Sequence, residues 1–203
     1  MTGRGAFAAA ADGTAPNVAA LRGLVEPGGG LFLVEDEGPP CPAGLEVALS
    51  APCAQMIGRD VAEVTGAFEI LPLGDADAAE MLALARLTQP GPFFEATHTL
   101  GAFVGVREGG RLLAMAGERM QPEGFTEISG VCTHPDVRGR GYAAVLSSLV
   151  ARRIQARGET PFLHAYGENT AAIALYERLG FVHRRVITLT VLAVEGVAIT
   201  LPH

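Results

Sequence analysis

The sequence predicts an α/β or α+β fold, in which helices cover the faces of a mixed sheet. From residue 68 onward, apolar runs of strand character and amphipathic helical patterns follow the order β-α-β-β-β-α-β-α-β. The early strands are joined by turns, which favours antiparallel pairing, and the later ones are separated by helices, as in βαβ units. Of the 203 residues, 49% are apolar, which is enough for a substantial core.

The elements of this main part are bounded by turn and cap signals. A short strand is expected at Phe68–Gly74, then a helix that starts near Asp75 or Asp77 and stops before Gln89. Glu108-Gly109-Gly110 predicts a hairpin turn between two apolar strands. Later elements are a strand from about Thr126, a helix from about Gly139 to Arg157, a strand at 161–166, a helix after Asn169 and a long strand from Phe181. Val186–Leu201 is interrupted by Glu195 and Gly196 and reads as a pair of buried strands.

Charge and cysteine content narrow the class of protein. A formal net charge of −7 argues against a nucleic-acid binder that relies on a general basic field. Three cysteines and no recognisable secretory signal favour reduced thiols in the cytoplasm. No span long and apolar enough for a membrane is apparent. We therefore expect no nucleic-acid partner and no membrane partner.

The stretch VCTHPDVRGRGYAAVLSSLV, at 131–150, carries the clearest chemical signal. A helix N-terminus leaves backbone amides unpartnered and carries a partial positive charge. Glycines just before it allow a ligand to approach the backbone, and Arg138 and Arg140 add positive charge. This combination suits a phosphate or pyrophosphate. A surface turn with solvated arginines is the plainer alternative, and an RNA-binding arginine–glycine repeat is a third.

Two motifs together resemble the GCN5-related N-acetyltransferases, and in particular the FR47-like branch. Arg138, Gly141 and Ala143 match the acetyl-CoA signature of that family, and GENTAAIALYERLGF at 167–181 matches its next motif. The two motifs are separated by a helix and a strand, as the family requires. The matching region covers roughly residues 68–194.

The resemblance implies a splayed sheet that holds acetyl-CoA, the acyl donor, in the gap between two strands, and no metal. Strand residues Val131, Cys132 and Thr133 would line the pantetheine arm. The loop from Arg138 through Gly139, Arg140, Gly141 and Tyr142 to Ala143 would hold the pyrophosphate, and Asn169 would contact the cofactor or simply cap its helix. The Cys132 side chain should face opposite to its neighbours and be buried, so a covalent acyl intermediate is the weaker interpretation.

The implied reaction is acetyl transfer to a primary amine of a small molecule or peptide, by direct attack in a ternary complex. Tyr176 occupies the position of the family's general acid, although a packed aromatic is the alternative. Glu127 lies eleven residues before Arg138, where related histone-modifying members carry a glutamate base. Glu118 and a water relay compete with it for the role of base.

Residues 1–66 show no family motif, whereas residues 67–203 form the expected acetyltransferase domain. The N-terminal segment, with a helix near 18–24 and strands at Leu31–Glu37 and Leu45–Ala51, could be a degenerate copy of the same fold, an extra layer or a homodimer arm. It also leaves open a second function, a non-catalytic sensor that binds CoA or acyl-CoA. The segment Pro90–Gly101 is a candidate wall of the amine pocket, with core packing as the alternative.

Overall fold

A computed structural model describes residues 6–26, 28–38 and 40–197. These residues form one nine-stranded mixed sheet in the order β1-β2-β9-β3-β8-β7-β6-β5-β4. The strands are β1 (Ala6–Phe7), β2 (Leu31–Glu35), β3 (Leu45–Gly58), β4 (Leu71–Leu73), β5 (Phe103–Glu108), β6 (Arg111–Glu118), β7 (Phe125–Thr133), β8 (Thr160–Tyr166) and β9 (Phe181–Val194). The α-helices are α1 (Ala15–Ala20), α2 (Ala78–Thr88), α3 (Tyr142–Ala156) and α4 (Thr170–Arg178), with short 3-10 turns at Leu21–Leu24, Asp75–Asp77, Thr97–Leu100 and Pro135–Val137.

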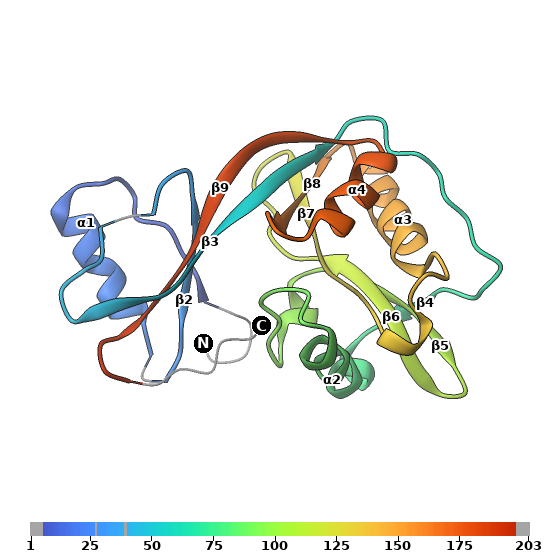
Figure 1. Cartoon of the computed structure of the whole chain (residues 1–203), viewed down its shortest axis with the longest axis horizontal. Coiled ribbons are helices and arrows are strands. Elements are labelled where there is room, and N and C mark those ends of the chain that lie inside the picture. The colour runs from blue at the N-terminus through green and yellow to red at the C-terminus, as the bar shows by residue number, and fades with distance from the viewer. Residues whose placement is uncertain (1–5, 27, 39, 198–203) are drawn as a thin grey trace.

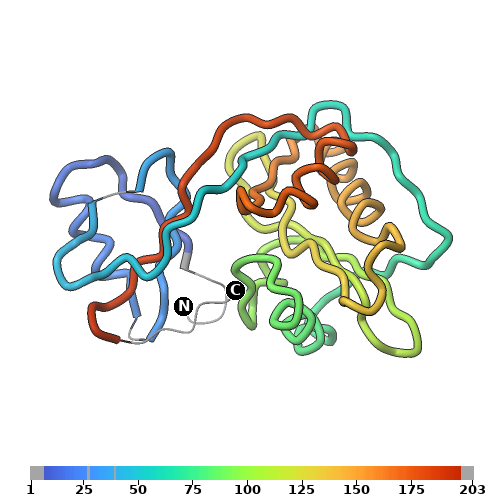
Figure 2. Tube along the Cα trace, in the orientation of Figure 1, coloured from blue at the N-terminus to red at the C-terminus, as the bar shows by residue number. Residues whose placement is uncertain are grey.

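Two long strands connect two lobes of the molecule (Figure 1). Strands β3 and β9 have 14 residues each and pair along their whole length. At one end they form a small N-terminal lobe with β1, β2 and α1, and at the other end they join the larger lobe through the pairing of β3 with β8. The continuous path of both strands between the lobes is clear in the Cα trace (Figure 2).

Helices cover both faces of the sheet in the larger lobe. Leu146, Val150 and Ile154 on α3 are at most 2% exposed and pack on one face, in a cluster with Ala116 of β6. On the other face, α2 buries Met81 against Met115 of β6. Burial of these apolar side chains is the main force that holds the layers together.

Local signals in the sequence are confirmed at several boundaries. Gly109 and Gly110 have φ of 58° and 80° and join β5 to β6, as a two-residue hairpin turn requires. The Oδ1 of Asn169 accepts a hydrogen bond from the N–H of Ala172 at 3.1 Å, so Asn169 caps α4. Gly158, with φ of 81°, follows the end of α3.

Two expected boundaries were wrong. The second N-terminal strand does not turn at Ala51, because β3 continues to Gly58. Pro52 lies within β3, just beyond the last residue that pairs with β8. Its carbonyl accepts a hydrogen bond from the N–H of Gly167 at 2.9 Å. Since the ladder with β8 has ended there, the missing N–H of Pro52 costs no ladder hydrogen bond on that side. The strand expected at Phe68–Gly74 is reduced to the three residues of β4.

The C-terminal pair of strands is confirmed in its first member only. Strand β9 ends at Val194, and a turn at Gly196, with φ of 73°, follows it. The expected second member falls in residues 198–201, which lie outside the described residues. The division expected at residue 66 does not coincide with a break in the sheet, because β3 lies between β8 and β9.

The parallel neighbours β7 and β8 pair at one end and separate at the other. Their register covers only Phe125 to Glu127 against Thr160 to Phe162. Beyond this point Ile128–Thr133 and Leu163–Tyr166 are not joined, which is the splay that the sequence resemblance implied. No helix within the described ranges has the length and apolar character needed to cross a bilayer.

Candidate active site

The loop before α3 has the geometry of an anion site. Gly139 and Gly141 adopt φ of 81° and 82°, a region that favours glycine, and a Cβ at either position would meet nothing within 4 Å. The backbone at both positions is therefore open to a ligand. The side chains of Arg138 and Arg140 are exposed, and the N-terminal amides of the 15-residue α3 follow directly.

Two residues that were expected to bind the pyrophosphate, Tyr142 and Arg140, also contact Glu108 of the protein itself. Tyr142 is buried, packs edge-on against Phe68 at 4.7 Å between ring centroids, and donates its hydroxyl hydrogen to Oε1 of Glu108 at 2.7 Å. The side chain of Tyr142 therefore packs under the loop and stabilises it. The part of Tyr142 that suits ligand binding is its backbone, in the first turn of α3. Arg140 lies 3.5 Å from Oε2 of the same Glu108, in a solvent-exposed ion pair.

The strand that leads to the loop carries a bulge at the splay. Met115 pairs with Cys132 and Gly117 with Ser129, so β7 has one more residue than β6 in this interval. The extra residue falls at Gly130 and Val131, where Gly130 has φ of 63°. Because the extra residue of a bulge has no opposite partner in the ladder, the backbone at this point is not committed to regular pairing with β6. Both residues line a pocket at the splay.

Thr133 and Cys132 face different surroundings. The Oγ1 of Thr133 is buried and has no hydrogen-bond partner among the described residues, which leaves a donor at the approach to the anion loop. The thiol of Cys132 packs beside Met115 and Leu84 in the core, and burial raises its pKa to about 12. A thiol held neutral in this way is a poor nucleophile, so its burial agrees with the expectation of a core side chain.

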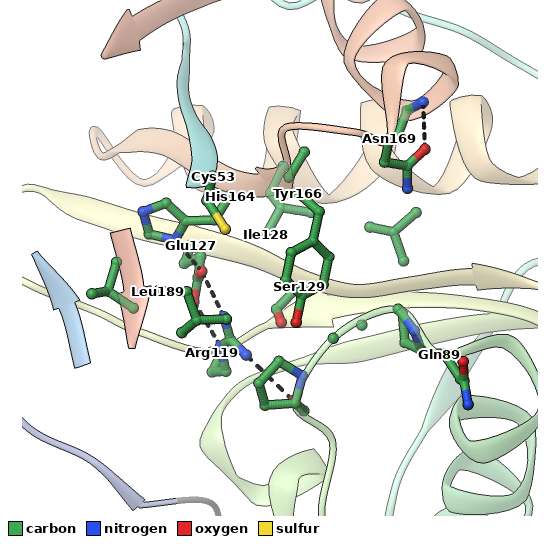
Figure 3. A pocket seen from close by; sticks show the side chains of 18 of the residues that line it. Cys53, Gln89, Arg119, Glu127, Ile128, Ser129, His164, Tyr166, Asn169 and Leu189 are labelled. Carbon is green, nitrogen blue, oxygen red and sulfur yellow. Dashed lines mark hydrogen bonds and ion pairs between the residues drawn. The ribbon is translucent and has the colours of Figure 1, made fainter. Parts of the chain in front are cut away.

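Tyr176 of α4 and Asn169, which caps α4, line the same pocket. Figure 3 shows Asn169 on the side of the pocket where this helix begins. Tyr176 is 8% exposed, and its ring contacts Phe181 at 5.8 Å between centroids. Burial raises the pKa of its phenol well above the ordinary value, and the nearby Cys132 adds to the shift. The hydroxyl therefore stays protonated at any ordinary pH, as a proton donor must.

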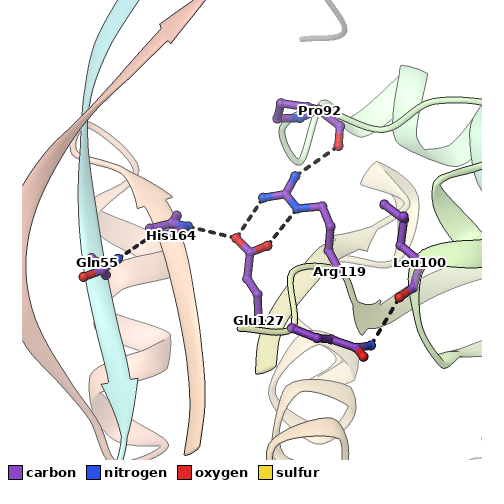
Figure 4. Close-up of polar contacts among 7 residues, drawn as sticks. Gln55, Pro92, Leu100, Arg119, Glu127 and His164 are labelled. Atoms are coloured by element: carbon purple, nitrogen blue, oxygen red, sulfur yellow. Dashed lines mark hydrogen bonds and ion pairs between the residues drawn. The ribbon is translucent and has the colours of Figure 1, made fainter. Parts of the chain in front are cut away.

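Glu127 is buried in the pocket wall and holds two partners (Figure 4). The Nε and Nη2 of Arg119 each donate to one of its oxygens at 2.8 Å, and Nδ1 of His164 lies 2.8 Å from Oε1. Burial by itself raises the pKa of Glu127, but the charge of Arg119 and the hydrogen bonds from His164 and Arg119 outweigh it and hold the pKa at about 2. The carboxylate is thus ionised but fully engaged.

The network continues from His164 to the strands that join the lobes. Arg184 of β9 donates to Oε1 of Gln55, so the amide nitrogen of Gln55 faces Nε2 of His164, at 2.9 Å. Nε2 must then accept, and Nδ1 carries the proton that is donated to Glu127. On the other side, Nη1 of Arg119 donates to the carbonyl of Pro92 at 3.3 Å. This chain of contacts fixes one tautomer of His164 and orients Glu127.

Glu118, the other candidate base, lies elsewhere. It is 5% exposed and binds Nη1 and Nη2 of Arg157 at 3.0 and 3.1 Å. It does not line the pocket that Tyr176 and Glu127 share, as far as the described residues show. The structure therefore separates two glutamates that the sequence could not distinguish.

The end of the pocket away from α4 is built across the lobes. Cross-strand register places Tyr166 of β8 opposite Cys53 of β3, and Val34 of β2 opposite Leu189 of β9. All four line the pocket, together with Phe7 of β1. The guanidinium of Arg119 stacks over the Phe7 ring at 4.5 Å from its centroid.

Sequence reasoning missed Arg119 and His164. Arg119 directly follows Glu118 at the end of an apolar run, and His164 is the one polar residue among apolar neighbours in PFLHAY. An isolated ionisable residue in a buried strand was the available signal. The expected wall at Pro90–Gly101 is present in part: Pro90, Gly91 and Pro92 line the pocket, whereas Phe93 packs in the core.

Comparison with known proteins agrees with this geometry. The model of the FR47-like protein family matches residues 103–189. A solved GNAT-family structure from Novosphingobium aromaticivorans is 45% identical, covers 95% of this chain and 86% of its own, and superposes with a TM-score of 0.87. The chain belongs to the GCN5-related N-acetyltransferase (GNAT) family.

More distant structures share the GNAT fold alone. A GCN5-related N-acetyltransferase from Kribbella flavida is 19% identical over 82% of this chain and 68% of its own, with a TM-score of 0.55. The ribosomal-protein-S18-alanine N-acetyltransferase of Escherichia coli is 20% identical over 62% of this chain and 92% of its own, with a TM-score of 0.52. No protein with a curated function matches the chain.

Proposed function

We propose that this GNAT protein transfers the acetyl group of acetyl-CoA to a primary amine of a small molecule or peptide, with both substrates bound at once. The observation that carries the proposal is one continuous pocket. Its lining includes Asn169 and Tyr176 on the α4 side and Leu189, Val34 and Phe7 on the side of the smaller lobe. A donor and an acceptor that enter from these two sides would meet inside the pocket, whose wall includes Tyr176.

The residues present fit the acyl donor. The open backbone at Gly139 and Gly141, the N-terminus of α3 and the exposed Arg138 suit a pyrophosphate, and the unpartnered Oγ1 of Thr133 offers one more donor. Acetyl-CoA supplies an acetyl thioester, whose carbonyl carbon is attacked. Metal ligation is not part of the proposal: within the described residues, no group of three histidine, cysteine or acidic side chains is arranged to hold an ion.

In the reaction a nitrogen–carbon bond forms, the carbon–sulfur bond breaks, and a proton moves from nitrogen to sulfur overall. A backbone N–H at the bulge of Gly130 and Val131, which line the pocket, is suited to the oxygen on which negative charge develops. The phenol of Tyr176, which is protonated near neutral pH as phenols with a pKa of about 10 are, lines the pocket and donates to the thiolate as negative charge builds on sulfur.

For Glu127 we propose a positioning role in place of the proton abstraction expected from the sequence. Both of its oxygens are engaged, and a pKa of about 2 makes it a weak base. Glu118 is bound to Arg157 away from the pocket. A water relay, the remaining alternative, would carry the proton from the amine to solvent.

Calorimetry with acetyl-CoA tests the donor site. Arg138→Ala should weaken binding about tenfold, because a charge-assisted contact to phosphate is lost. Arg153→Ala is the matched control: it removes an exposed arginine from the far end of α3 and should leave affinity unchanged. Absence of binding by the unaltered protein would refute the proposal.

Tyr176→Phe tests the chemistry. We expect kcat to fall about 100-fold, as is usual for the loss of a general acid, while the affinity for acetyl-CoA is retained. Release of the free thiol of CoA gives the rate, and calorimetry gives the affinity. An unchanged kcat would remove Tyr176 from the mechanism.

A further inference from the structure

The acceptor end of the pocket is apolar where it is formed by the smaller lobe. Val34, Leu189 and Phe7 contribute only hydrocarbon surface, and Cys53 adds a thiol whose pKa burial raises to about 11. Figure 3 shows Leu189 and Cys53 on the side of the Arg119–Glu127 pair, with Asn169 on the opposite side. A bound amine would therefore place its body against this wall and its nitrogen toward Tyr176.

The charged groups of the pocket compensate each other. Among the described lining residues, Glu127 is the one carboxylate and Arg119 the one guanidinium, and they bind each other through two contacts of 2.8 Å. The third contact of Glu127 goes to His164. Among the lining residues that the structure describes, no carboxylate is left to receive a second ammonium group, and burial of an unpaired charge in such surroundings is costly.

An apolar wall also favours the reactive form of the acceptor. Removal of an ammonium from water disfavours its charged form and lowers its pKa. This effect supplies neutral amine without a side chain that acts as base, in agreement with the engaged state of Glu127.

On the basis of the proposed acetyltransferase function, we infer that the acceptor is a primary monoamine carried on an apolar aliphatic or aromatic body, selected by the wall of Phe7, Val34 and Leu189. Polycationic amines are selected against, because a second charge would face this wall without a partner. The smaller lobe thus determines acceptor specificity, while the larger lobe binds the donor.

A pair of amines of equal length tests this inference. Release of CoA thiol is measured with n-hexylamine and with 1,6-diaminohexane, which differ by one terminal amino group. We expect kcat/KM to be about 100-fold higher for hexylamine, since the diamine must bury or neutralise a second ammonium. Equal turnover of the two, or preference for the diamine, would overturn the inference.

Two substitutions test which residues determine the preference for hexylamine over the diamine. Val34→Asp adds a carboxylate to the half-buried wall and should narrow the preference for hexylamine at least tenfold, with acetyl-CoA affinity unchanged. Val47→Asp is the control, because Val47 is 48% exposed on β3 and does not line the pocket. An equal effect of both variants would contradict the assignment of the wall.

Failure of the inference can be told apart from failure of the proposed function. Binding of acetyl-CoA without turnover of either amine would overturn the acceptor class and leave the donor site intact. Absence of acetyl-CoA binding would overturn the proposed function and the inference with it.

Discussion

Two buried glutamates in this protein each bind one arginine, in different places. Glu127 and Glu118 each receive two hydrogen bonds from one arginine, at 2.8 to 3.1 Å. The side chain of Arg119 is 9% exposed and lines the pocket, whereas that of Arg157 is 43% exposed and does not line it. Ion-pair geometry alone therefore does not distinguish the carboxylate in the pocket wall from the one outside it; the surroundings of the arginine partner do.

The largest expected difference is in stability. Glu127→Gln leaves the buried Arg119 without a counter-charge and should lower the free energy of unfolding by about 3–5 kcal/mol. Glu118→Gln leaves an arginine that solvent can reach, so about 1 kcal/mol is expected. Urea denaturation measures both. Equal losses would mean that the exposure of the arginine does not decide the strength of the pair.

A fall in pH should lower the free energy of unfolding, because Glu127 becomes protonated. Its folded pKa of about 2 lies below the ordinary value of 4.5, so its contribution is complete above pH 4.5 and is lost as pH falls toward 2. The linked free energy is about 3 kcal/mol. Urea midpoints between pH 5 and pH 2 should fall less steeply for Glu127→Gln than for the unaltered protein. A parallel fall in both would contradict the low pKa.

Exchange of arginine for lysine is a milder test. Arg119→Lys cannot keep two parallel contacts to Glu127 and should reduce kcat/KM about tenfold. Arg157→Lys, at the exposed pair, should leave kcat/KM unchanged and alter stability by at most about 0.5 kcal/mol. Loss of activity in Arg157→Lys would show that the second pair also supports the site.

The smallest expected effect is a shift in a pH profile. With Glu127 ionised at all working pH values, kcat/KM should rise about tenfold per pH unit until the pKa of the acceptor amine itself. Two acceptor amines of different pKa should therefore give different midpoints. A midpoint common to both would indicate an ionising group of the protein, and Glu127 or its neighbours would return as the base.

Much of the larger lobe could be predicted because its signals are local. The paired glycines at 109–110 determine a turn by themselves, and Asn169 caps the helix that it precedes. The donor loop combines Arg138 and two glycines within four residues, so the sequence displays it directly.

The proposed acceptor side of the pocket depends on contacts between distant segments. Phe7, Val34 and Leu189 meet only because β2 pairs with β1 on one side and with β9 on the other, relations that no spacing within the sequence expresses. The contacts of Glu127 were likewise hidden, since its position before Arg138 suggested a base, whereas Arg119 and His164 from other segments engage both of its oxygens.

The insertion of β3 between β8 and β9 also affects the order of folding during synthesis. β3 comes early in the chain, yet both of its sheet neighbours are made more than a hundred residues later. Until β9 leaves the ribosome, the edges of β2 and β3 stay unpaired, and such edges promote association with other chains. The sheet can therefore be completed only after β9 has been synthesised. Because this pairing joins residues far apart in the sequence, we expect refolding to be slow.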